Sequence, residues 1–338
     1  MNDPRVSIVI PARNEESYIG KCLDSILLQD YPATLLEVFV CDGKSTDQTA
    51  ERVKDYASRH PGIHLLVNEQ QTTSFGLNKG IRASTGDFVI ILGAHAELAT
   101  DYVKQCLAAY SYSDKVGCTG GILENIYEND QAEIIGLAMS SGFGVGNAHF
   151  RTGSKEGVVD TVAFGAYARK VFEKAGYFDE ELVRCQDDEY NFRVVKAGFD
   201  IVLSRNIKCR YYVRASFQKL YRQYYQYGYW KVYVNKKHQT ITTSRQLVPL
   251  FFVLYLIGIL PVYLLLPGLG ILYLQGAVLY LAVSLGTAFR ISRRFKQVMP
   301  VVLSFFILHF SYGYGYLKGI IHFLFLGRKV QLDEKLSR

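Results

Sequence analysis

Acidic residues are missing from a long part of this sequence, because no aspartate or glutamate occurs between residues 201 and 332. Residues 1–200 hold 19 of the 38 Lys and Arg and 29 of the 31 Asp and Glu, a net charge of −10. Residues 201–338 hold the other 19 Lys and Arg and the other 2 Asp and Glu, a net charge of +17. Cations beside apolar runs are typical of a segment on an anionic membrane, where each Lys or Arg close to the surface contributes roughly 1 kcal/mol of binding free energy. The apolar runs favour a membrane over a nucleic acid as the partner.

Three sequence patterns that would indicate other protein classes are also absent. The six cysteines form no Cys-x-x-Cys pair, which argues against a zinc site and a disulfide framework. The first residues have no basic segment followed by an apolar one, so we expect no secretion signal. Residues 11–16 lack the glycine fingerprint of dinucleotide-binding reductases. We therefore expect the first 200 residues to be cytosolic, with reduced thiols.

Short apolar runs alternate with amphipathic segments in the first part of the chain. The predicted strands are residues 6–10, 38–40, 64–67 and 88–92, and the predicted helices are residues 17–28 and 49–59. This alternation predicts an α/β fold with a doubly wound, mostly parallel sheet. Ligands bind beyond the carboxyl ends of such strands, so Asp42 lies where a ligand would be met. The alternative is that Asp42 and Asp47 only cap a helix.

Four motifs resemble, in order and spacing, the nucleotide-sugar half of family 2 glycosyltransferases with the GT-A fold. They are Pro-Ala-Arg-Asn-Glu-Glu at 11–16, Asp-Gly-Lys-Ser-Thr-Asp at 42–47, Gly-Leu-Asn-Lys-Gly at 76–80 and Ala-Ser-Thr-Gly-Asp at 83–87. The resemblance covers about residues 6–231 and is nearest to bacterial exopolysaccharide transferases of the succinoglycan type. It implies a GT-A catalytic domain that binds a nucleotide-sugar donor, with a UDP-sugar as the expected one.

The resemblance also implies which residues contact the donor. Asp42 is expected to accept a hydrogen bond from the base N3–H, because a desolvated carboxylate facing a ring N–H makes a short, charge-assisted bond. Asp47 is expected to hold the loop. The residues implied to bind the nucleotide sugar are Pro11, Ala12, Asn14, Glu15, Asp42, Ser45, Asp47, Lys79, Ala94 and His95.

A carboxylate is missing where the family binds a divalent cation. Family members carry Asp-x-Asp or Asp-Ala-His after the fourth strand, whereas this sequence has Gly93, Ala94 and His95. His95 is left as the candidate ligand for Mg²⁺ or Mn²⁺, although both ions favour oxygen donors. The sequence leaves open whether His95 binds a metal, contacts a phosphate or is structural.

The predicted chemistry lies in Gln-Asp-Asp-Glu at residues 186–189. An inverting transfer needs a carboxylate to take the proton from the acceptor hydroxyl, and neighbouring acids favour proton uptake by one of them through mutual repulsion. The resemblance matches Gln186 and Asp187 to the family's Glu-Asp pair, which makes Asp187 the base and Asp188 an acceptor-side neighbour. The alternative is an acidic helix start stabilised by the helix dipole. Residues 140–147 are glycine-rich and are expected to form a mobile acceptor-side loop.

Aromatic and basic residues dominate residues 210–237, which predicts helices in the membrane interface. Residues 226–230 resemble the Gln-x-x-Arg-Trp motif of membrane synthases. The residues expected on the acceptor or diphosphate side are Gly165, Arg222, Gln226 and Trp230. Residues 247–266 and 269–289 are long enough to span a bilayer. Residues 298–326 could span, double back or lie in the interface.

The predicted organisation has four parts. They are a cytosolic GT-A catalytic domain at 1–205, basic aromatic interfacial helices at 206–246, a transmembrane or membrane-associated region at 247–328 and a cytosolic tail at 329–338. We expect an inverting glycosyltransferase at the cytosolic face of the inner (plasma) membrane. It would move a sugar to a polyprenyl-pyrophosphate-linked glycan in exopolysaccharide, capsule or O-antigen synthesis. A polyprenyl-phosphate sugar synthase and a non-catalytic nucleotide-sugar-binding membrane protein remain the alternatives.

Overall fold

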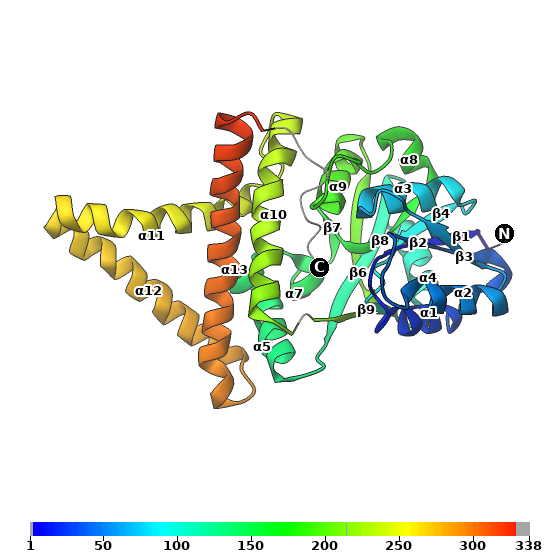
Figure 1. The fold of residues 1–338 in the computed structure, drawn as a ribbon, viewed down its shortest axis with the longest axis horizontal. Coiled ribbons are helices and arrows are strands. Elements are labelled where there is room, and N and C mark those ends of the chain that lie inside the picture. Colours follow the sequence, from blue (N-terminus) through cyan, green and yellow to red (C-terminus); the bar gives the residue numbers. More distant parts are fainter. Residues whose placement is uncertain (1–2, 214, 329–338) are drawn as a thin grey trace. The chain divides into compact units, whose positions relative to one another are not determined.

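The computed structural model describes residues 3–213 and 215–328, and the chain divides into two compact units. The first, here called the sheet unit, comprises residues 1–125 and 149–212. The second, here called the helical unit, comprises residues 126–148 and 213–338 (Figure 1). The predicted tail at 329–338 lies outside the described residues. Residues 126–148, which fall inside the predicted catalytic domain, are therefore grouped with the C-terminal helices.

The sheet unit is built on a nine-stranded sheet of order β3-β2-β1-β4-β8-β6-β9-β5, with β7 paired to β9. The strands are β1 (Val6–Ala12), β2 (Leu36–Asp42), β3 (Ile63–Val67), β4 (Phe88–Ile91), β5 (Ala96–Leu98), β6 (Val116–Ile126), β7 (Gly157–Val159), β8 (Ala163–Ala168) and β9 (Asp200–Tyr212). The first four strands are parallel, as predicted. From β8 onward the sheet is antiparallel, so the whole sheet is mixed.

Helices connect the parallel strands because their apolar residues recur at helical spacing. In α1 the residues Ile19, Cys22, Leu23 and Ile26 form one buried face. The helices of the sheet unit are α1 (Ile19–Leu27), η1 (Ala33–Leu35), α2 (Thr49–Arg59), α3 (Thr73–Ala83), α4 (Tyr102–Ala108), η2 (Ala109–Tyr112), α7 (His149–Thr152), α8 (Arg169–Ala175) and α9 (Gln186–Lys196). All six cysteines are free and buried. Burial raises the pKa of the Cys106 thiol to about 12.

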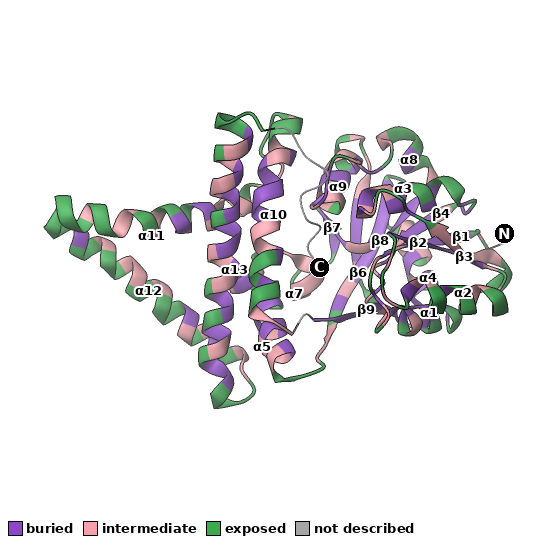
Figure 2. Cartoon of the chain, in the orientation of Figure 1, coloured by how far each residue is buried: buried purple, intermediate pink, exposed green. Residues whose placement is uncertain are grey.

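The helical unit contains the long apolar helices. Its elements are α5 (Asp130–Met139), α6 (Gly142–Val145), α10 (Phe217–His238), η3 (Ser244–Leu247), α11 (Val248–Leu265), α12 (Pro267–Ile291), η4 (Phe295–Gln297), α13 (Val298–Gly319) and η5 (Ile320–Phe325), the last a π-helical turn. Among residues 3–213 and 215–328, three helices are long and apolar enough to cross a membrane, namely Ser244–Leu265, Pro267–Ile291 and Phe295–Phe325. In Figure 2, α11 and α12 are largely exposed along their length.

Two predicted segments differ from the structure. The interfacial helices were expected from residue 206, but residues 206–212 complete β9, because Arg210 pairs with Glu97 and Tyr211 with Ala96 across the antiparallel β5–β9 ladder. The helix begins only at Phe217. Residues 140–147, expected as a loop, contain the short helix α6.

Candidate active site

Two loops that follow β1 and β2 are joined by hydrogen bonds. Asn14 has a left-handed backbone (φ 54°), and its backbone N–H donates to Ser45 Oγ at 2.9 Å. The Asn14 side-chain oxygen accepts from the Thr46 backbone N–H at 2.8 Å. Asn14 and Ser45, two of the residues expected to bind the donor, therefore lie side by side although they come from two distant parts of the sequence.

Asp42 ends β2 beside this pair of loops and is only 5% exposed. Its two carboxylate oxygens accept from the backbone N–H of Ser45 at 3.1 Å and from Ser45 Oγ at 2.5 Å. A carboxylate oxygen offers two acceptor positions, so Asp42 retains capacity for a further donor such as a ring N–H. Lys79 is exposed on α3, and its ammonium donates to the Val67 carbonyl at the end of the neighbouring strand β3 at 2.5 Å.

Asp47 fixes the start of α2. Burial alone would raise the pKa of this carboxyl, but hydrogen bonds from Thr49 and from the Glu16 backbone outweigh burial and lower the pKa of Asp47. Its oxygens accept from the Thr49 backbone N–H at 3.0 Å and from the Glu16 N–H at 3.2 Å. Asp47 therefore holds both loops in place, as expected from the sequence.

His95 lies at the position where the family places its metal-binding motif. Its Nδ1 is 3.4 Å from Glu15 Oε1, and its ring packs edge-on against Tyr211 with centroids 5.1 Å apart. A side chain at Gly93 would place its Cβ 2.9 Å from the ring of Phe164, a residue with a left-handed backbone (φ 51°). The Phe164 ring thus fills the space that a carboxylate at position 93 would need.

These residues do not form a complete cation site. Within residues 3–213 and 215–328, no group of three or more His, Cys, Asp or Glu is arranged to hold a metal ion. The side chains at this point are one imidazole and the carboxylate that faces it, whereas Mg²⁺ needs near-octahedral oxygen ligands. His95 and Glu15 therefore do not by themselves supply the ligand set of a Mg²⁺ site.

The acidic cluster forms the first turn of α9. Asp187 is exposed and Asp188 is half-buried, but the Glu189 side chain is 2% exposed and engaged by Arg193 through two hydrogen bonds of 2.7 and 2.9 Å. A buried carboxylate paired in this way stabilises structure rather than accepting a substrate proton. Glu189 is thus committed to its pair with Arg193, and the roles expected of Asp187 and Asp188 stay predictions.

A buried hydrogen-bond chain positions α9. The Tyr167 hydroxyl donates to Asn191 Oδ1 at 2.7 Å, and Asn191 Nδ2 donates to Thr161 Oγ1 at 2.8 Å. Burial raises the pKa of Tyr167, and the nearby charge of Asp187 adds to the effect. In the preceding loop, the Leu182 carbonyl accepts from Ser74 Oγ at 2.9 Å.

The Gly-Leu-Asn-Lys-Gly motif also has a structural role that the sequence analysis did not predict. Asn78 donates from Nδ2 to the Phe178 carbonyl at 2.8 Å and accepts from the Phe178 N–H at 2.9 Å. An amide at this point of α3 therefore ties the donor-side motif to the loop that leads into α9. The partner lies 100 residues away, so no local pattern indicates it.

The other predicted site residues fall into two groups. Pro11, Ala12 and Ala94 lie at the ends of β1 and β4 with apolar side chains, and Gly165 is buried where a Cβ would lie 2.6 Å from Cys118 Sγ. These positions in the sheet unit are explained by packing, and their contact with substrate stays a prediction. The remaining three, Arg222, Gln226 and Trp230, share a face of α10 in the helical unit, with Arg222 exposed and Trp230 buried.

Comparisons with known proteins show which sequences this chain resembles. A dolichyl N-acetyl-alpha-D-glucosaminyl phosphate 3-beta-D-2,3-diacetamido-2,3-dideoxy-beta-D-glucuronosyltransferase from Methanococcus voltae is 33% identical over 325 residues, 94% of this chain and 97% of that protein. The succinoglycan biosynthesis protein ExoA from Rhizobium meliloti is 26% identical, over 72% of this chain and 74% of its own length.

Solved structures show the same fold. A mannosyltransferase from Pyrobaculum calidifontis, in complex with GDP-Man and Mn²⁺, has a TM-score of 0.64 and 20% identity, and covers 92% of this chain and 88% of its own. Residues 7–176 match the family model described as Glycosyl transferase family 2. On this match and the 33% identity to the Methanococcus protein, the chain belongs to glycosyl transferase family 2 and is a glycosyltransferase with the GT-A fold.

Proposed function

We propose that this glycosyltransferase moves a sugar, with inversion, from a UDP-sugar to a sugar or glycan carried on a polyprenyl-type lipid phosphate or pyrophosphate. The observation that carries the proposal is that one chain combines the loop pair around Asp42 with three helices long and apolar enough to cross a membrane. The name of the Methanococcus relative describes transfer to a dolichyl-phosphate-linked N-acetylglucosamine, which supports this class of acceptor.

The donor end of the proposal rests on Asp42. Its buried carboxylate is oriented by Ser45 and accepts the N3–H of the uracil ring, a bond that a cytosine ring cannot supply. Lys79 of α3, whose ammonium contacts the carbonyl at the end of β3, is proposed to lie on the same side of the bound nucleotide.

Asp187 is proposed as the general base. It removes the proton of the acceptor hydroxyl while that oxygen attacks the anomeric carbon and the bond from this carbon to the nucleotide diphosphate breaks. Asp188 is proposed to hold the acceptor, since Glu189 is engaged by Arg193.

The leaving diphosphate gains negative charge that must be met. We propose that His95 contacts the diphosphate or a divalent cation carried by the donor, and that the chain builds no metal site of its own around Gly93. Arg222, Gln226 and Trp230 on α10 are proposed to act on the acceptor or diphosphate side.

The sheet unit is proposed to face the cytosol at the inner (plasma) membrane. Arg290 lies in the last turn of the second apolar helix, and Arg293, Arg294 and Lys296 follow it. No acidic residue is near them in sequence, which is the charge bias of a loop on the cytosolic side.

The test is a transfer assay with the purified full-length protein in lipid nanodiscs. Labelled UDP- and GDP-sugars are offered with three acceptors: polyprenyl phosphate, polyprenyl phosphate carrying one N-acetylglucosamine, and the corresponding pyrophosphate. Label from a UDP-sugar on either saccharide-bearing lipid supports the proposal, and the two lipids distinguish phosphate from pyrophosphate. Label on the bare lipid phosphate would instead indicate a polyprenyl-phosphate sugar synthase. Donor binding without transfer to any acceptor would indicate the non-catalytic alternative.

A further inference from the structure

The third apolar helix is packed differently from the other two. Half of the apolar window in Phe295–Phe325 is buried inside the protein (50%), compared with 11% in each of the other two candidate spans. In Figure 2, α13 carries buried residues along its whole length, whereas α11 and α12 are mostly exposed. Length and composition alone therefore class together helices that have different surroundings.

The second half of α13 packs against α10 with glycines at the contact. A side chain at Gly315 or Gly319 of α13 would run into the backbone carbonyls of Tyr225 and Tyr229 of α10. Small residues four apart allow this close approach of two helix backbones. Near the end of α10, Lys236 donates to the Phe323 carbonyl at 2.7 Å. The contacts progress in the same order along both helices, so α10 and α13 run in the same direction.

The charged side chains of α10 prevent α10 and α13 from crossing a bilayer together. Residues 213–216 are too few to span the hydrocarbon, so α10 begins on the side of the membrane that holds the sheet unit. If α13 crossed, α10 would cross beside it. The cations of α10 are Lys219, Arg222, Lys231, Lys236 and Lys237. Such side chains are costly in hydrocarbon and the helix holds no acid to pair with them.

The first half of α13 is held by the insertion at residues 126–148. Phe143 of α6 packs on Phe305 with centroids 4.9 Å apart, and its carbonyl lies 2.8 Å from His309 Nε2. Only residues 127–129 separate the end of β6 from the start of α5, so α5 also begins on the sheet unit's side.

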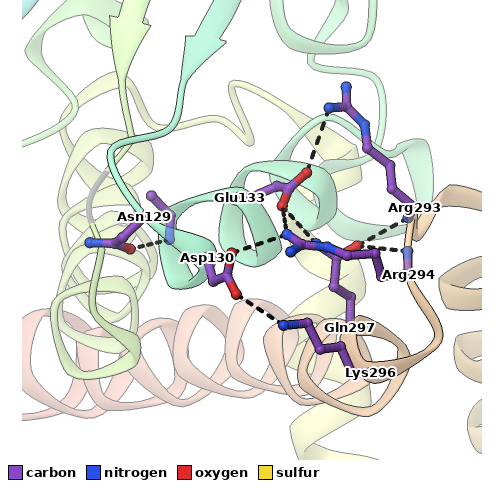
Figure 3. A network of polar contacts seen from close by, with 8 residues as sticks. Asn129, Asp130, Glu133, Arg293, Arg294, Lys296 and Gln297 are labelled. Carbon is purple, nitrogen blue, oxygen red and sulfur yellow. Dashed lines mark hydrogen bonds and ion pairs between the residues drawn. The ribbon is translucent and has the colours of Figure 1, made fainter.

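A polar cluster joins the start of α5 to the start of α13 (Figure 3). Arg294 donates to Asp130 at 3.0 Å and also to Glu133, whose side chain is 13% exposed. Gln297 Nε2 donates to Glu133 at 2.7 Å, and Lys296 lies 3.4 Å from Asp130. The loop between α12 and α13 is therefore fixed to a segment on the sheet unit's side.

The remaining face of α13 is apolar and exposed. Its residues Met299, Leu303, Phe306 and Tyr314 recur at helical spacing, and Met299 is 65% exposed. The hairpin of α11 and α12 meets α13 next to this stripe, where Phe252 contacts Phe306, and then extends crosswise away from α13 (Figure 1). The bare apolar surface of the hairpin is thus continuous with the stripe.

We propose that α13 lies in the membrane interface and does not span, with this apolar stripe in the leaflet on the sheet unit's side. Only the hairpin of α11 and α12 crosses the bilayer, so the chain crosses twice and residue 328 ends on the side where it began. The ligand of the stripe is the lipid acyl layer, and α10 and the insertion at 126–148 cover the opposite side of α13.

Nitroxide depth measurements on the full-length protein in vesicles of phosphatidylcholine and phosphatidylglycerol test this proposal. Labels are placed by Met299→Cys, Phe306→Cys and Leu324→Cys, with Val278→Cys of α12 as the matched spanning control. All four side chains are exposed, and the native cysteines are buried. We expect one shallow depth for the two positions in α13 and the one in η5, and a deeper one for Val278→Cys. A depth that increases from position 299 to 306 and decreases again at 324 would contradict the proposal, as would labels on α13 that lipid-dissolved oxygen does not reach.

Tag protection in sealed vesicles provides a second measurement that needs no internal substitution. Protease-cleavable tags are placed at the two ends of the same protein. We expect added protease to remove both tags from the same molecules, because both ends lie on one side. Removal of only one tag per molecule would show an odd number of crossings and overturn the proposal.

Discussion

The sheet unit and the helical unit differ in the contacts that bring distant segments together. In the sheet unit, polar side chains bridge long sequence separations, as Asn14 does to Thr46 and Asn78 to Phe178. In the helical unit, polar contacts such as Arg294 to Asp130 are joined by a close approach of helix backbones at Gly315 and Gly319. The acid-free stretch from residue 201 obtains its carboxylates from the insertion, through Asp130 and Glu133. The carboxylates proposed to bind the donor and to act as the base thus lie in the sheet unit, whereas the long apolar helices lie in the helical unit.

The largest effect is expected in the sheet unit, from Asp187→Asn. Loss of the general base should lower turnover at least about 100-fold, while UDP binding is retained. Asp188→Asn is the matched control, and steady-state transfer rates in nanodiscs measure both. If Asp187→Asn turned over at nearly the wild-type rate while Asp188→Asn did not, the base would be Asp188.

In the helical unit, Gly315→Ala should weaken the contact between α10 and α13. The added Cβ meets the Tyr225 carbonyl, and such overpacking typically costs about 1–3 kcal/mol. Gly286→Ala in α12 is the control, because its Cβ would meet nothing within 4 Å. Thermal unfolding in detergent should therefore separate the two variants. Equal unfolding temperatures would show that the close approach at Gly315 does not contribute to the stability of this unit.

The sheet unit should also lose stability in alkali. The pKa of the Cys106 thiol is raised from 9.0 to about 12 by burial, so the folded state holds this proton more tightly than the unfolded state. The contribution is fully present below about pH 9 and is lost as the pH rises towards 12. Denaturant midpoints at pH 8 and pH 10 measure it, and Cys106→Ala should reduce the difference without abolishing it, because burial also raises the pKa of four other thiols. An unchanged slope in that variant would assign the effect to other groups.

The smallest effect is expected from His95→Ala. If His95 contacts a cation carried by the diphosphate, the variant should need more Mn²⁺ for half-maximal rate but recover at saturation. Titration of the rate with Mn²⁺ measures this. A tight, sub-micromolar requirement that is the same in wild type and variant would show that a carboxylate elsewhere holds the ion.

The sequence predicted most of the parallel half of the sheet unit, because its signals are local. The predicted helix 49–59 coincides with α2, and the predicted strand 88–92 differs from β4 by one residue. β9 was misassigned at residues 206–212, because its partner β5 is more than 100 residues away and an aromatic, basic strand has the same composition as an interfacial helix. The insertion at 126–148 was missed for the same reason.

Part of the candidate site was equally visible in the sequence. The loops around Asn14 and Ser45 follow strands directly, and hydrogen bonds join them in the structure. The pairing of Glu189 with Arg193 follows helical i,i+4 spacing and could have been predicted. The position of the Phe164 ring beside Gly93 could not have been predicted, because no sequence pattern indicates a phenylalanine with a left-handed backbone conformation.

The central claim is that one unit holds separate donor-binding and catalytic groups. The most direct test is calorimetric titration of UDP into the wild type, Asp42→Ala and Asp187→Asn. We predict that Asp42→Ala weakens UDP binding by roughly 1–3 kcal/mol, the cost of stranding a buried hydrogen-bond partner, and that Asp187→Asn binds UDP as the wild type does. Unchanged UDP affinity in Asp42→Ala, or an equal loss in both variants, would contradict the account.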